Sequence, residues 1–440
     1  MRKRKRADPL TDFSRPERQE TVPVTQIARQ AWVVWAAGAL TYVIAIFNRG
    51  SLGVAGPLAA ERLGVDATAL STFSAVQLGV FAATQIPVGL LVDRYGPRKT
   101  LTTSLVVMAT GQALVAGGCD FTSVLAGRAL LGSGDAMVMI SVLRLIASWF
   151  PTSRAPILAQ ATVMVGTAGG LVAVPPLSAA LGAFGWEPVF FTVAAVTAGW
   201  IFVVWIGVRD SPTGAAPRGP ALPPVTLRTA LAEAWHQPST QLGLWLMLLV
   251  QFPVQVFVLL WGYPFLTQGQ GLSPSTASYA TAAPLLVTMS LGPVFGTISG
   301  RRPGWRLPIV LGIAVTTTLT WSLVLLWPGL RPPLPVLIVL ALVLGLGNPA
   351  AVFGLDIARS GSPAHRVGAA TGIANVGGYT GALIAVMLIG VTLDLAHTGP
   401  GHPDASDFRT AMATQVLLQI LGAGLLLRQA RRIPNKPASP

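Results

Sequence analysis

Charged residues are scarce in this chain of 440 residues. They make up 10% of the sequence, whereas ordinary globular domains carry roughly a quarter. Hydrophobic residues make up 52%, and a water-soluble fold of this length has too little polar surface to cover them. The composition therefore excludes a soluble globular protein and predicts one that is embedded in a lipid bilayer.

Cysteine and histidine are also scarce, and this limits the available chemistry. The single cysteine, Cys119, excludes a disulfide framework and a cysteine-rich metal site. The histidines lie in polar connecting segments, at His236, His365, His397 and His402. The sequence has no cluster of histidines and acids for a metal, no activated serine or cysteine and no phosphate-binding loop. We therefore expect no enzyme activity, no catalytic residues, no metal and no cofactor.

Long apolar runs fill most of the chain. Each is long enough for a helix of about 20 residues across a hydrocarbon core of about 30 Å. The twelve predicted spans cover residues 31–57, 71–91, 100–118, 122–150, 155–181, 188–207, 239–266, 275–299, 307–327, 335–356, 367–394 and 408–427. An even number of spans predicts that both termini lie on the same side of the membrane.

Basic residues give the chain a net charge of +14, and their distribution explains the excess. With the amino terminus inside, 24 of the 30 lysines and arginines fall on the inner side, whereas Arg62, Arg331 and Arg409 fall outside. This bias is typical of membrane proteins, whose cytoplasmic loops carry the positive charge. We therefore expect an integral, multi-pass protein of the cell (plasma or inner) membrane, with both termini cytoplasmic. Its partner is the lipid bilayer, and no nucleic-acid partner is expected.

Two polar stretches suggest how the chain is divided. Residues 1–30 mix basic, acidic and proline residues, which is typical of a disordered cytoplasmic tail. Residues 209–238 contain SPTGAAPRGPALPP and predict a cytoplasmic linker. The remaining predicted units are a six-helix bundle over 31–208, a second six-helix bundle over 239–428 and a cytoplasmic C-terminal tail over 429–440.

The loop between the second and third predicted spans carries the most specific motif of the chain. Residues 89–99 read GLLVDRYGPRK, which resembles, position for position, the G-x-x-x-D-R-x-G-x-R-K signature of the major facilitator superfamily. The resemblance implies an all-α membrane protein of twelve transmembrane helices in two pseudo-symmetric six-helix bundles, with the substrate site between them near the midplane. It also implies gating roles for Gly89, Asp93, Arg94, Gly96 and Arg98.

Asp93 is the residue to which we assign the main gating role. Its carboxylate can accept hydrogen bonds from the amino terminus of an opposing helix, where the helix dipole favours an anion. In the family this contact closes the cytoplasmic side, and the eleventh span, which begins near Val367, is the expected partner. Gly89 is expected to allow a close approach of helices. The alternative is that Asp93 only pairs with Arg94 in a solvated loop.

Three charged side chains stand out inside the predicted spans: Arg49 in the first span, and Arg128 and Asp135 in the fourth. A charge at this depth costs about 3 kcal/mol or more, so it faces a partner or a water-filled cavity and not lipid. Arg128 and Asp135 are seven positions apart, which places them on one helix face about 10 Å apart. The alternative to a functional role is a permanent ion pair that holds the first helix to the fourth.

Three patches of sequence refine the family resemblance. Residues 128–136 read RALLGSGDA and are followed by SWFP at 148–151. Residues 370–378 read ATGIANVGG, and Asn48-Arg49 stands in the first span. These patches resemble the anion:cation symporter branch, which includes proton-coupled transporters of sugar acids and other organic anions.

The branch resemblance implies a role for each of four residues. Arg49 and Arg128 are expected to hold a substrate carboxylate, Asp135 to carry the coupling proton and Asn375 to hydrogen-bond the substrate. Asn48 departs from the branch, because an acid usually stands at its position and an amide cannot titrate. Asp135 is also one methylene shorter than the usual glutamate.

Gln255 is the remaining candidate for the substrate site. It lies on the seventh predicted span, which the resemblance implies lines the cavity, and both substrate contact and a hydrogen bond between helices remain open for it. Together these features predict a secondary active transporter that imports a small organic anion with a proton by alternating access and functions as a monomer. An exporter (antiporter) of drugs or metabolites and a non-transporting membrane sensor are the alternatives.

Overall fold

The computed structural model of the chain describes residues 24–151, 154–212, 232–362, 367–398 and 402–432. All regular secondary structure in these ranges is helical, and twelve spans are long and apolar enough to cross a membrane. The predicted all-α class and the predicted number of spans are therefore confirmed. Most of the predicted tails and linker lies outside the described residues, although the first helix begins within the predicted amino-terminal tail.

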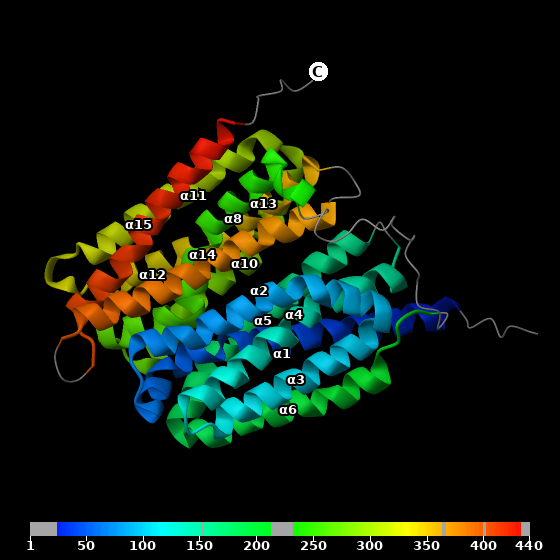
Figure 1. The fold of residues 1–440 in the computed structure, drawn as a ribbon, viewed down its shortest axis with the longest axis horizontal. Helices are drawn as coiled ribbons and strands as arrows, with labels where there is room; N and C mark the ends of the chain where they lie inside the picture. Colours follow the sequence, from blue (N-terminus) through cyan, green and yellow to red (C-terminus); the bar gives the residue numbers. More distant parts are fainter. Residues whose placement is uncertain (1–23, 152–153, 213–231, 363–366, 399–401, 433–440) are drawn as a thin grey trace, which may run out of the picture.

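The first six spans form one half of the molecule, coloured blue to green in Figure 1. Within it α3 packs on α4 and α6, while α1 packs on α4 and α5. The helices are α1 (Val24–Leu63), α2 (Ala67–Tyr95), α3 (Pro97–Gly117), α4 (Phe121–Trp149), α5 (Ala155–Phe184) and α6 (Trp186–Gly207).

The last six spans form the other half, coloured green to red in Figure 1. The seventh span begins as α8 (Pro238–Val256) and continues through π-helical turns at Phe257–Trp261 and Phe265–Gly269 that flank α9 (Gly262–Pro264). The others are α10 (Pro274–Arg301), α11 (Arg306–Leu325), α12 (Leu334–Leu344) with α13 (Gly347–Ser360), α14 (Val367–Ala396) and α15 (Ala405–Ala430). Short 3₁₀ turns occur at Pro303–Trp305 and Pro328–Leu330.

The tenth span differs from the continuous helix that its hydropathy predicts. It breaks between α12 and α13, at Gly345 and Leu346. A Cβ on Gly345 would lie 2.6 Å from the carbonyl oxygen of Pro284 in α10. Only glycine permits this close approach, so the break is also a contact point between helices.

The two halves face each other through α1, α2 and α5 on one side and, on the other, through the middle of the seventh span (Phe257–Trp261 and α9), α10 and α14. We call the end that holds the α2–α3 turn at Gly96 the termini end, and the opposite end, with the turn at Gly64, the far end (right and left in Figure 1). Towards the far end the Ser71 hydroxyl donates to the carbonyl oxygen of Val386 at 3.0 Å. This bond runs between α2 and α14, so the halves are closed against each other at the far end.

Candidate functional site

An ion pair buried between α1 and α4 is the centre of the candidate site. Arg49 donates from Nε and Nη2 to the two carboxylate oxygens of Asp135, at 2.6 and 2.8 Å. The two residues are 8% and 2% exposed. This is the bidentate geometry that a guanidinium forms with a carboxylate. The same two donors can equally hold the carboxylate of a ligand.

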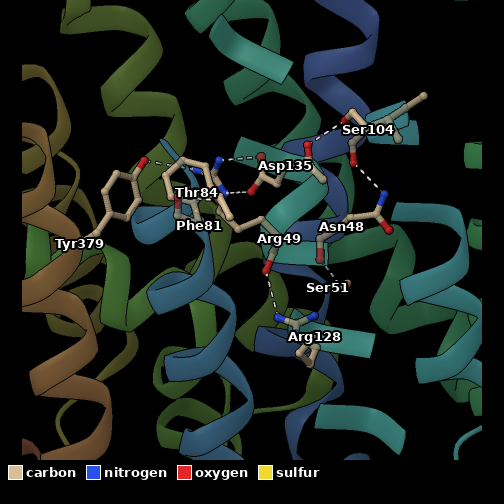
Figure 2. Close-up of polar contacts among 11 residues, drawn as sticks. Asn48, Arg49, Ser51, Phe81, Thr84, Ser104, Arg128, Asp135 and Tyr379 are labelled. Atoms are coloured by element: carbon tan, nitrogen blue, oxygen red, sulfur yellow. Dashed lines mark hydrogen bonds and ion pairs between the residues drawn. The ribbon is translucent and has the colours of Figure 1, made fainter. Parts of the chain in front are cut away.

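Two aromatic rings enclose the rest of the Arg49 guanidinium (Figure 2). Its central carbon lies 4.7 Å from the centre of the Phe81 ring, which is within the range of a cation–π contact. Its Nη1 donates to the hydroxyl of Tyr379 at 3.5 Å, and the rings of Phe81 and Tyr379 pack at 4.8 Å. Because Tyr379 belongs to α14, the second half of the molecule contacts the charged group of the first half here.

Arg128 is buried beside this pair and bonds to the backbone of Arg49 rather than to Asp135. Its Nη2 donates to the backbone carbonyl oxygen of Arg49 at 3.4 Å (Figure 2), and the residue is 1% exposed. Its Nε and Nη1 find no hydrogen-bond partner in the described part of the chain. A buried donor without a partner costs about 1–3 kcal/mol, and more when it is charged. The position therefore favours a ligand or water that accepts from Arg128.

Asn48 forms hydrogen bonds that hold α1 against α6, and its amide cannot carry a proton as a carboxylate does. Its Nδ2 donates to the carbonyl oxygen of Ile44 at 2.9 Å and to the hydroxyl of Thr197 at 3.4 Å. These bonds stay within α1 and reach α6, so they point away from the charged group. Asn48 is 1% exposed, and its Oδ1 has no partner among the residues that the structure describes.

Gln255 and Asn375 are half-buried. Neither is a hydrogen-bond partner of Arg49 or Asp135 among the described residues, and their roles remain predictions. Asn375 lies one turn before Tyr379 on α14, so both residues are on the same helix face. One turn before Gln255, the buried Gln251 packs against Gly378 of α14, where any side chain would collide with its Oε1 atom.

The signature turn between α2 and α3 is held by a carboxylate that sequence reasoning missed. Asp210, just after α6, accepts from the backbone N–H of Arg98 at 2.7 Å. Gly96 has φ +84°, and a Cβ there would lie 2.8 Å from Oδ2 of Asp210. The Arg98 guanidinium stacks 4.5 Å above the ring of Trp205 and donates to its carbonyl oxygen. Gly96 and Arg98 therefore fix the turn to the end of α6.

The other gating candidates show different surroundings. A Cβ on Gly89 would meet no described atom within 4 Å, and the helix approach expected at this glycine stays a prediction. Arg94 is exposed and stacks on the ring of Tyr95 at 5.3 Å. The side chain of Asp93 lies outside the described residues. Its contact with the start of α14, or with Arg94, stays a prediction.

Comparison with known proteins identifies the family. The model of the Major Facilitator Superfamily matches residues 38–437. The chain belongs to the major facilitator superfamily. It is a membrane transporter and not an enzyme, as the signature loop predicts.

Similar proteins within the superfamily transport organic acids. The chain is 26% identical to the probable galactarate/D-glucarate transporter GarP of Escherichia coli (strain K12) over 390 residues, which cover 80% of the chain and 85% of GarP. It is also 26% identical to the probable sulfoacetate transporter SauU of Cupriavidus necator over 173 residues, 39% of the chain and 40% of SauU. This second match thus spans less than half of the relative.

The fold also matches a solved transporter structure. A bacterial homologue of the human lysosomal transporter Spinster, in an inward-facing and unoccupied conformation, superposes with a TM-score of 0.73. The match covers 91% of this chain and 97% of that structure at 16% identity. The likeness confirms the major facilitator fold of two six-helix bundles.

Proposed function

We propose that this protein imports a small organic anion together with a proton, by alternating access between its two halves. The observation that carries the proposal is the charge balance of the buried site. Arg49 and Arg128 supply two guanidinium groups, and Asp135 is the one carboxylate that faces them among the described residues. One positive charge is therefore left without a counter-ion where charge is costly. An anion that enters the site supplies it.

The same geometry supports a coupling to protons. A substrate carboxylate that binds Arg49 bidentately competes with Asp135, because both need the Nε and Nη2 donors. A carboxylate displaced from its partner at this depth is costly as an anion, and binding a proton removes that cost. Binding of the anion and binding of the proton would thus favour each other.

The orientation that we propose follows from the basic residues. Of the 30 lysines and arginines, 24 fall on the side of the termini, which makes the termini end cytoplasmic by the positive-inside rule. The far end, where the halves are closed, is then extracellular. We expect the protein to work as a monomer in the cell membrane, because each chain carries both halves of the cycle.

Asp135→Asn in proteoliposomes tests the proposal. A carboxylate substrate is first selected by the thermal stabilisation that binding produces. The variant resembles a permanently protonated transporter. We expect it to lose accumulation driven by a proton gradient and to keep exchange of substrate for substrate. Glu187→Gln is the control, because this carboxylate pairs with Arg62 on the surface, where it is 54% exposed.

Three outcomes decide against the proposal. Proton-driven accumulation that survives in Asp135→Asn would exclude this residue as the proton carrier. Accumulation that requires the opposite proton gradient would identify an exporter. Loss of folding that is restored in the double variant Asp135→Asn/Arg49→Met would show that the ion pair is structural, since breaking a buried pair costs about 3–5 kcal/mol.

A further inference from the structure

A carboxylate of the second half caps a helix of the first half at the far end of the molecule. Asp394, near the end of α14, accepts from the backbone N–H groups of Ala67 and Thr68 at 2.9 and 2.8 Å. It also accepts from the Thr68 hydroxyl. Ala67 and Thr68 are the first two residues of α2. Three hydrogen bonds therefore join the two halves through one side chain.

The hydrogen bonds of Asp394 to α2 can form only while the two halves are in contact at the far end. The first N–H groups of a helix have no partner within the helix, and the helix dipole makes this end positive. A carboxylate there forms charge-assisted bonds, which are stronger than neutral ones. Asp66 caps the same helix from within its own half, accepting from the N–H of Ala69 at 2.7 Å. The first turn of α2 thus meets two carboxylates, and only Asp394 is withdrawn when the far end opens.

Next to Asp394, the backbones of α14 and α2 approach each other closely. Gly390 lies one turn before Asp394, and a Cβ on it would come 2.7 Å from the carbonyl oxygen of Ala67 and closer still to the hydroxyl of Ser71. Any side chain at this position would push α14 away from α2. Glycine therefore lets the two helices touch at the level where Asp394 reaches the end of α2.

We propose that Asp394 is the extracellular gating residue of the transport cycle. Its bonds to the first turn of α2 close the outer end and break each time that end opens. That this end is extracellular depends on the orientation proposed above. That Asp394 closes this end depends only on its contacts with α2. If Asp93 caps the start of α14 at the other end, as predicted, α2 and α14 carry one such contact at each end.

The test measures access to a cysteine placed behind the gate. Ser74→Cys in a Cys119→Ser background provides the probe, because Ser74 is 3% exposed and its hydroxyl has no partner among the described residues. It lies one turn beyond Ser71 on α2. A membrane-impermeant methanethiosulfonate reagent is added outside cells or right-side-out vesicles. We expect Asp394→Asn to raise the labelling rate about tenfold, which corresponds to a shift of about 1.4 kcal/mol in the gate.

Two further variants test the same contact from other positions. Thr68→Val removes the hydroxyl donor at nearly constant volume and is expected to raise the labelling rate a few fold. Gly390→Val forces the helices apart and is expected to raise it as much as Asp394→Asn. Thr68→Val also keeps the proposal testable if Asp394→Asn fails to fold, and a rate equal to that of the parent would then refute the gate.

Asp66→Asn is the matched control, because it removes a carboxylate from the same helix end without removing a hydrogen bond between the halves. An equal rise in this control would show that a weakened α2, and not an open gate, exposes Ser74→Cys, and would overturn the proposal. So would a normal rate in a folded Asp394→Asn protein. A rise seen only when the reagent is added from the cytoplasmic side would overturn the extracellular assignment. No substrate is needed, so failure to transport an anion would refute the proposed function and leave this gate standing.

Discussion

Replacing Arg49 with lysine separates the geometry of the site from its charge. Arginine presents two parallel donors, which hold both oxygens of Asp135 at 2.6 and 2.8 Å. Lysine keeps the positive charge but is a point charge that cannot form this fork. A hydrogen bond to a charged group contributes about 1.5–3 kcal/mol. Losing one of the two should therefore weaken binding of a carboxylate about 10- to 100-fold.

The assay is thermal stabilisation by the ligand, with uptake kinetics as a second measurement. At a ligand concentration of about 100 times Kd, binding stabilises the folded protein by about 2.7 kcal/mol, and a 100-fold loss of affinity reduces this to about 0.4 kcal/mol. Arg62→Lys is the control, because Arg62 pairs with Glu187 on the surface at 2.7 Å. Wild-type affinity in a folded Arg49→Lys protein would refute direct recognition of the anion by the guanidinium.

Three other substitutions test the turn at Gly96 and the buried Arg128. Gly96→Ala forces a side chain into φ +84° and against Asp210, so we expect a loss of about 1–3 kcal/mol, measured by thermal unfolding in detergent. Gly89→Ala, which meets open space, should cause no comparable loss, and equal effects would contradict the reasoning. Arg128→Leu removes a buried guanidinium with two unpartnered nitrogens, so stability should hold or rise while affinity for the anion falls. Unchanged affinity would exclude Arg128 from the site.

Hydropathy was sufficient to predict the number and approximate position of the spans, because each must cross the same apolar layer. It could not predict the break in the tenth span. At that break Gly345 contacts the backbone of Pro284, which lies 61 positions earlier in the sequence. The seventh span is also less regular than its composition indicates, since two π-helical turns follow Val256.

The charged residues of the site could be found from the sequence, as could an ion pair between the first and fourth spans, but not the bidentate geometry of that pair or the aromatic rings around it. Helix spacing places Asp135 on the face of Arg128, whereas the structure pairs it with Arg49 of another helix. Asp210 and Asp394 were missed because both bind backbone N–H groups, and a backbone partner leaves no pattern in the sequence. Tyr379 was missed because an aromatic residue in an apolar span is most often part of the packing.

The bond between Asp210 and Arg98 sets where the connection between the two halves begins. The chain is anchored to α3 at Asp210, and helical structure is described again from residue 232. A chain segment of about 20 residues spans at most about 70 Å when fully extended. A covalent connection of this length keeps the effective concentration of each half near the other high. Two halves produced as separate chains that reassemble should therefore retain the motions of the intact transporter.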